Sequence, residues 1–289
     1  MSSEQRYSSS SDDDDEVVGS LTSRFSSLSI PPSNGASSRP NLDSRGRCDP
    51  ELSDRLRKDA WKASAEDGLL FDSRDYPEED RSKLLESFFE TSAPSKVKRS
   101  EGIGWIRILS PSFEDKEVDQ EGLDSDWEKL QKSGKPINFD AVTKLAKSYS
   151  CLVGIWLLFF DTGDPVDTAW KKIATATAKD ELGTHAKVTP YEDAGEGKTL
   201  HGTQHAISVY TADFSDKEDV MRLEGILRGM GMKCRMAYKP SVYSKLGLYS
   251  QNKWRLRPGI YSSQWDAIKR VGSIRDSTKA RETFFLNFQ

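Results

Sequence analysis

Positive charge and aromatic rings are concentrated in residues 228–265. This stretch holds eight basic side chains and no acidic one, although the chain of 289 residues has a formal net charge of -4. Cations bind phosphate oxygens and aromatic faces stack on bases at roughly 1–3 kcal/mol each, so this composition suits a ligand that carries both groups. The alternative interpretation is a pair of strands whose rings are core and whose lysines face water. The basic residues are Arg228, Lys233, Arg235, Lys239, Lys245, Lys253, Arg255 and Arg257, and the rings are Tyr238, Tyr243, Tyr249, Trp254, Tyr261 and Trp265.

Lys239 begins the first of two candidate segments within this stretch. It precedes Pro240, which favours extended geometry for the lysine and ends a strand there. A lysine at a strand end can point towards a ligand. Lys245 adds a further cation, while Tyr243 and Tyr249 offer rings for stacking.

The second candidate segment is residues 252–258, where cations alternate with apolar side chains. In extended chain this alternation puts Lys253, Arg255 and Arg257 on one face. Trp254 then takes the other face, which favours a core position over a stacking platform. The candidate ligand-binding residues are therefore Lys239, Tyr243, Lys245, Tyr249, Asn252, Lys253, Arg255 and Arg257, with Lys187, next to a strand end, as a weaker addition.

Catalytic and metal-binding patterns are not evident elsewhere. His185, His201 and His205 lie within 21 residues but lack the cysteines and the spacing of a metal site. Residues 195–199 resemble the end of a Walker loop, yet the glycine required five positions before Gly197 is Glu192. No nucleophile elbow occurs, and no carboxylate stands alone in an apolar run. We expect no enzyme, no cofactor and no metal.

Cysteine usage and hydropathy predict an intracellular protein. Cys48, Cys151 and Cys234 are odd in number and form no CxxC pair, which is typical of reduced thiols in the cytosol or nucleus. No apolar run approaches the roughly 20 residues of a membrane span, and none resembles a signal peptide. We expect a cytoplasmic protein, with the nucleus as a second compartment, and no membrane contact. The sequence does not indicate an oligomeric state.

Composition divides the chain into three parts. Residues 1–48 are rich in serine, glycine and acid and are predicted to be disordered, because they cannot bury enough apolar surface. Their acidic run, residues 12–16, could fold back on the basic stretch and compete with an anionic ligand. Residues 49–265 are expected to form one domain with an N-terminal helical extension, and residues 266–289 a C-terminal tail.

Periodicity predicts an α+β domain with helices on one face of a mainly antiparallel sheet. Residues 206–238 also fit a parallel crossover, which stays open. One helix is expected to begin with Asp164 as its N-cap, and another with a capping box of Ser215 and Glu218. Strands are expected at residues 104–109, 152–160, 186–190, 206–211 and 232–238, and further helices within 50–90, with Leu52, Leu56 and Trp61 on one face, and at 123–132 and 138–149.

Several segments resemble the basophilic-leukaemia-expressed protein family, which has no assigned activity. The similarity covers roughly residues 68–263 and implies the curved, mainly antiparallel sheet, with helices on its convex side, of the 4E-type cap-binding translation initiation factor. The segments are Gly104-Trp105-Ile106, Trp127-Glu128-Lys129-Leu130, Ala169-Trp170-Lys171-Lys172-Ile173-Ala174, Ala186-Lys187-Val188-Thr189-Pro190, Val209-Tyr210-Thr211-Ala212-Asp213-Phe214, Tyr238-Lys239-Pro240 through Tyr249, and Asn252 to Tyr261.

The resemblance implies that fold without implying cap binding. Cap binders hold methylguanine between two tryptophans, one of them in the loop after the first core strand, and residues 161–165 contain none. They read the base edge with a Trp-Glu pair on a later loop, whereas Trp127-Glu128 falls on a predicted helix. Trp156 and Trp170 match structural positions. From the basic and aromatic stretch at residues 228–265 we expect a non-catalytic binding protein for RNA or a nucleotide, or alternatively a scaffold that docks an acidic protein on the same basic face.

Overall fold

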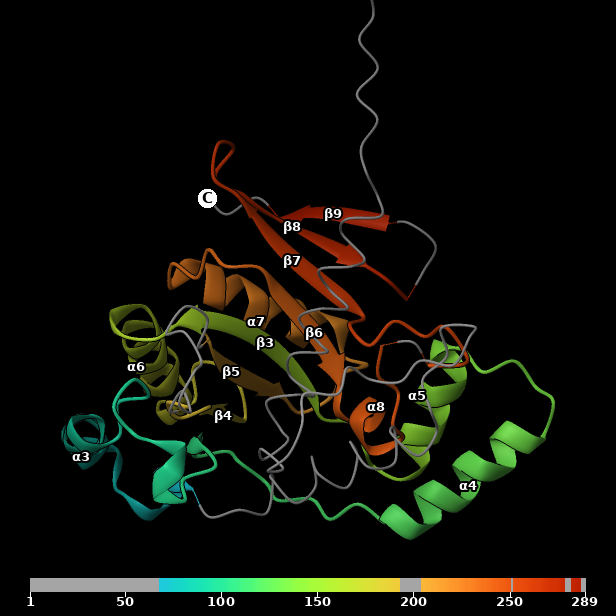
Figure 1. Ribbon diagram of the computed structural model, residues 1–289, viewed down its shortest axis with the longest axis horizontal. Helices are drawn as coiled ribbons and strands as arrows, with labels where there is room; N and C mark the ends of the chain where they lie inside the picture. The colour runs from blue at the N-terminus through green and yellow to red at the C-terminus, as the bar shows by residue number, and fades with distance from the viewer. Residues whose placement is uncertain (1–67, 193–203, 251, 279–281, 287–289) are drawn as a thin grey trace, which may run out of the picture.

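One mixed sheet organises the described part of the chain. The computed structural model describes residues 68–192, 204–250, 252–278 and 282–286 (Figure 1). The predicted tail at 1–48, the helical extension around Leu52 and Trp61, and the Walker-like loop with His201 lie outside these residues. Within them the chain is α+β, as predicted, with nine strands in a single sheet.

The strands run in the order β1-β2-β4-β5-β3-β6-β7-β8-β9. β1 pairs with β2 in parallel, and every other neighbouring pair for which register is defined is antiparallel. The predicted, mainly antiparallel sheet is therefore confirmed. The strands are β1 (Leu69–Asp72), β2 (Ile106–Leu109), β3 (Gly154–Asp161), β4 (His185–Val188), β5 (Gln204–Thr211), β6 (Met236–Pro240), β7 (Tyr261–Asp266), β8 (Val271–Asp276) and β9 (Glu282–Leu286).

All described α-helices contribute apolar side chains to one main core. Trp156 and Leu158 of β3 point into this core, whereas Ile155, Leu157 and Phe159 alternate to the opposite side. We call that opposite side the second face. No described helix contributes a residue to its apolar cluster. The helices are α3 (Glu78–Thr91), α4 (Gln120–Lys132), α5 (Phe139–Ser148), α6 (Asp164–Ala178), α7 (Lys217–Gly229) and α8 (Ser241–Lys245), with 3-10 turns η1 (Ser73–Asp75) and η2 (Arg99–Glu101).

β3 is buried on both faces, as its continuous apolar run predicts. It pairs with β5 on one side and β6 on the other, both antiparallel. β5 and β6 therefore run in the same direction, with α7 crossing between them. The open question of a crossover is resolved: the two strands are parallel to one another but separated by β3.

Two predicted helix starts are each displaced by one residue. Gly163, with φ of 100°, is the N-cap of α6, and Asp164 is the first helical residue. α7 is capped by Asp216, whose carboxylate accepts from the backbone N–H groups of Glu218 and Asp219. The hydroxyl of Ser215 instead donates to Asp213. In each case the chain turns one residue away from the residue chosen from sequence.

The predicted C-terminal tail at 266–289 is corrected by the structure. β8 lies antiparallel to β7, and β9 continues the sheet beyond β8 (Figure 1). Alternate residues of β8 are buried, including Ile274. Pairing with β7 orders this segment, although its own apolar content is low.

Candidate functional site

Lys239 and Tyr249 are two members of the predicted ligand-binding set whose side chains the structure brings together. Lys239 lies on β6 opposite Ile155, which places its side chain on the second face. Its ammonium is 5.1 Å from the centroid of the Tyr249 ring. The lysine is fully buried, and burial lowers its pKa to about 8.

Tyr243, Lys245 and Asn252 have local structural contacts. Tyr243 is buried in the main core. Lys245 donates to the side-chain oxygen of Gln120. Asn252 fixes a turn, because its side chain donates to two backbone carbonyls and accepts from the N–H of Leu256. The geometry gives these residues packing and turn-forming roles.

Lys253, Arg255 and Arg257 are exposed, and Trp254 is half-buried, as the alternation predicts. Trp254 packs edge-on against Trp127, with 4.8 Å between ring centroids, so its predicted core position is confirmed. The backbone is a turn rather than a strand, and Arg255 has a φ of 57°. Lys253 donates to the side-chain oxygen of Gln131 on α4, away from Lys239.

Arg228 shows how the acid-free stretch is neutralised from elsewhere. Its guanidinium lies 2.9 Å from the carboxylate of Glu224, and both side chains are buried. It also donates to the backbone carbonyls of Met232 and Cys234 and to the hydroxyl of Ser263. This cation is a structural link between α7 and the sheet, unavailable to a ligand.

A different pair of cations stands on the second face, at Arg107 and Lys187. They are direct register partners on the neighbouring antiparallel strands β2 and β4. Both are partly exposed, and neither makes an ion pair with the described residues. The Nε of Arg107 is buried and has no hydrogen-bond partner in this part of the chain. Like charges in direct cross-strand register are destabilising, so the pair needs an explanation.

Aromatic rings hold Lys187 in place. Its ammonium lies 3.8 Å from the centroid of the Trp105 ring and 5.7 Å from that of Tyr210. Tyr210 in turn stacks on His185, with 3.8 Å between centroids and an interplanar angle of 17°. A cation over an aromatic face is stabilised by about 0.5–2 kcal/mol, more when desolvated. The rings therefore keep the ammonium beside Arg107.

Strand register places these groups in two adjacent rows across the second face. One row runs through Arg107, Lys187, Ser208, Leu157 and Ala237. The next row contains Leu109, His185, Tyr210, Ile155 and Lys239. The first row contains no carboxylate, and the second contains one on β1, where Asp72 is in register with Leu109. Lys187 and Lys239 stand three strand spacings apart, roughly 14 Å.

The electrostatics of this face reflect burial and unbalanced positive charge. Burial, and secondarily the charge of Arg107, lowers the pKa of Lys187 to about 7. The pKa of His185 is held well below its usual value by burial and then by Lys187 and Arg107. An anion on this face would offset the repulsion and favour the protonated lysine.

Sequence reasoning identified Lys187 as a weak candidate and missed Arg107, Trp105 and Tyr210 as its neighbours. Trp105 was assigned correctly to the core, with 4% of its surface exposed. The available signal was Arg107 within an apolar strand, on the same side as Trp105 by strand alternation. Pairing that strand with β4 is a tertiary property, so the sequence did not join Arg107 to Lys187.

Residues 128–247 match the family model described as Basophilic leukemia-expressed protein Bles03. Over these residues the chain is similar to the Bles03 family. The Bles03 match extends from within α4 to just beyond α8 and includes Lys187, Tyr210 and Lys239. Trp105 and Arg107 lie before it. The family name states no biochemical activity.

The described residues contain neither a metal-binding cluster nor a membrane-spanning helix. No group of three or more histidine, cysteine or acidic residues there is arranged to hold a metal ion. Among the helices in that part of the chain, none has the length and apolar character needed to cross a membrane.

Proposed function

We propose that this protein is a non-catalytic protein that binds a phosphate-bearing ligand, RNA or a nucleotide, at Arg107 and Lys187. The adjacency of these two uncompensated cations carries the proposal. Arg107 can donate two parallel hydrogen bonds to phosphate, and Lys187 adds a point charge. Lys239 lies on the same side of the sheet but is fully buried, so we assign it to the proposed site as a source of positive charge beneath the surface.

A binding role is favoured over catalysis by the surroundings of Lys187. A lysine with a pKa of about 7 can serve as a general base. Ser208, its neighbour in register on β5, is fully buried and its hydroxyl makes no hydrogen bond to Lys187. This arrangement supplies no activated nucleophile, which supports a role in holding anions.

The test is a titration of the full chain with a fluorescent single-stranded RNA at several salt concentrations. Each phosphate contact released by salt contributes about -0.7 to the slope of log affinity against log salt. Lys187→Met should weaken binding and make the slope shallower by about one contact. Lys253→Met is the matched control, because Lys253 also lies over a tryptophan ring, at 4.5 Å from the Trp254 centroid. Equal effects of the two substitutions would contradict the proposed site.

Docking of an acidic protein is the second candidate function. It is favoured by the exposure of Lys253, Arg255 and Arg257 on one turn. Charge reversal at Arg255 and Arg257 would then abolish capture of an acidic peptide, such as polyglutamate, and leave RNA affinity unchanged. If the double variant lost RNA binding while Lys187→Met kept its RNA affinity, the RNA site would lie on the turn at Lys253, Arg255 and Arg257 and not at Lys187.

A further inference from the structure

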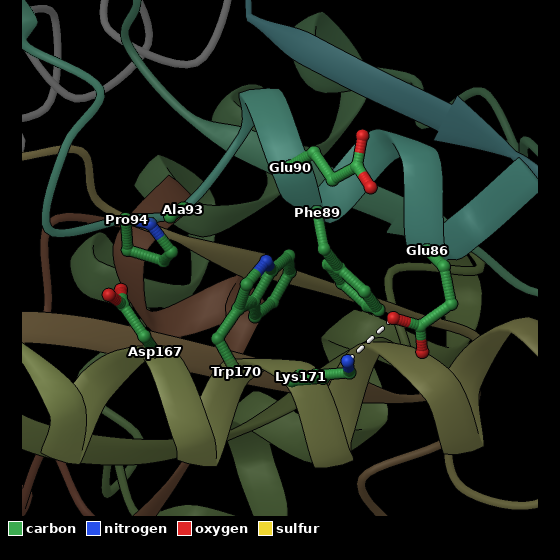
Figure 2. Close-up of a pocket in the computed structure, with 8 residues that line it drawn as sticks. All are labelled: Glu86, Phe89, Glu90, Ala93, Pro94, Asp167, Trp170 and Lys171. Atoms are coloured by element: carbon green, nitrogen blue, oxygen red, sulfur yellow. Dashed lines mark hydrogen bonds and ion pairs between the residues drawn. The ribbon is translucent and has the colours of Figure 1, made fainter.

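A separate pocket lies on the helical side of the sheet, between α3 and α6 (Figure 2). Its volume is about 250 Å³. Glu86, Phe89 and Glu90 line it from α3, and Asp167, Trp170 and Lys171 from α6. A cavity of this size holds a small ligand, since one water takes up about 30 Å³ in the liquid. None of the groups proposed above for phosphate binding lines this pocket.

The walls of the pocket carry excess negative charge. Three of its lining residues are acidic, Glu86, Glu90 and Asp167, against the single cation Lys171. Lys171 is already paired with Glu86 at 2.6 Å. Asp167 is held in place by the backbone N–H and the hydroxyl of Ser95. Glu90 makes no ion pair or side-chain hydrogen bond within the described residues, so its carboxylate is available to a cation.

A second observation points to a ligand: the indole N–H of Trp170. Only 1% of this side chain is exposed, and its Nε1 is buried without a hydrogen-bond partner in the described chain. Figure 2 shows this nitrogen on the edge of the ring that faces α3 and Pro94, towards the pocket. An unmet buried donor costs about 1–3 kcal/mol, and an oxygen acceptor on a ligand would satisfy it.

Lys171 shows how an ammonium is accommodated at this place. Its Nζ lies 5.7 Å from the centroid of the Phe89 ring while it contacts Glu86. Carboxylate and aromatic ring thus already act together on one ammonium. Glu90 and the Trp170 ring lie next to Glu86 and Phe89 and can act on a second.

We propose that this pocket binds a small organic ammonium ion that also carries an oxygen acceptor. The ammonium is balanced by Glu90, its carbon chain contacts Phe89 and Trp170, and its oxygen accepts from the Trp170 indole. A free amino alcohol and a lysine residue, with its backbone carbonyl, both have this chemistry.

Three probes separate the parts of the proposal. The ¹⁵N-labelled chain is titrated with 4-aminobutan-1-ol, n-butylammonium and 1,4-butanediol, and the Trp170 indole resonance, assigned with Trp170→Phe, is followed. The amino alcohol should bind most tightly, butylammonium more weakly because it lacks the acceptor, and the diol least because it lacks the charge. Equal responses to the amino alcohol and the diol, or no response to either amine, would overturn the proposal.

A pair of variants tests the role of the carboxylate. Glu90→Gln should weaken the amino alcohol roughly three- to fivefold, in the range of a partly exposed ion pair. Glu79→Gln is the control, because it removes an exposed carboxylate from the same helix away from the pocket. Equal affinities in the two variants would contradict a direct contact with Glu90. Nα-acetyl-lysine amide, which keeps its side-chain ammonium, distinguishes a protein lysine from a free amine as the natural ligand. Tighter binding than the amino alcohol assigns the pocket to a protein lysine, and weaker binding assigns it to a free amine.

Discussion

Arg107 and Lys187 face each other across two antiparallel strands, cation beside cation, with no carboxylate in their row. Opposite charges stabilise a cross-strand pair, whereas like charges in register weaken it. Here Trp105 compensates in part by taking the lysine ammonium on its face. A bound anion would therefore stabilise this pair of cations.

Replacing Arg107 should raise the pKa of Lys187. The charge of Arg107 is the second cause of the low value of about 7, after burial, so Arg107→Met should move the pKa upwards without restoring 10.5. NMR of ¹³C-labelled lysine side chains across a pH titration measures the change. An unaltered or lower pKa in Arg107→Met would show that the two side chains do not interact as their register implies.

The free energy of unfolding should increase as the pH rises from 7 to 9. Burial and Arg107 lower the pKa of Lys187 to about 7, and burial lowers that of Lys239 to about 8, from 10.5. In this interval the unfolded chain binds more protons, so deprotonation favours the folded state. The contribution of the two deprotonated lysines to the free energy of unfolding is complete above pH 10.5 and is lost as the pH falls through 8 and then 7.

Urea unfolding at pH 7, 8 and 9 measures this dependence. Lys187→Met should give a shallower rise than the unchanged chain, whereas Lys253→Met should reproduce its slope. A stability that falls over this interval in the unchanged chain would contradict the assignment of both lysines.

The buried pair of Arg228 and Glu224 should be far more important for stability than an exposed pair on the same helix. Arg228→Met should lower the free energy of unfolding by about 3–5 kcal/mol, because it leaves the Glu224 carboxylate buried without its partner. Arg222→Met removes the more exposed contact to Asp219, at 2.7 Å, and should cost under about 1 kcal/mol. Urea unfolding compares the two, and similar losses would be the contrary result.

Gly154 should not tolerate alanine. A Cβ at this position would lie 1.9 Å from the hydroxyl oxygen of Tyr238 and 2.9 Å from the Cβ of Phe214. Gly154→Ala should cost about 1–3 kcal/mol through overpacking. Gly229→Ala is the control: no heavy atom lies within 4 Å of the added Cβ, and alanine favours the helix by up to about 1 kcal/mol. Thermal unfolding that ranks the two variants in the opposite order would contradict this packing.

Helices and strands were predictable from the sequence where the spacing of apolar residues alone indicates the element. The apolar run of β3 and the helical spacing of Leu85 and Phe88 in α3 predict those elements directly, because burial selects the side chains. β8 was missed because its order depends on pairing with β7. The 4E-type fold stays an expectation from resemblance.

The candidate site was predictable only in part. Sequence placed Lys239 on a strand and Trp254 in the core, and the structure agrees. It grouped Lys239 with Lys253 because they are near in sequence, although the Lys253 side chain contacts α4, away from Lys239. Arg107 and Lys187 are far apart in the chain and meet through strand register, which no local pattern reveals.

The pKa of Lys187, measured with and without a phosphate-bearing ligand, tests the proposed site most directly. A phosphate bound between Arg107 and Lys187 favours the protonated amine, so saturating single-stranded RNA should raise this pKa above about 7, and RNA affinity should fall as the pH rises through that value. A pKa of Lys187 that stays the same with bound RNA, while the Lys253 resonance shifts, would contradict the account.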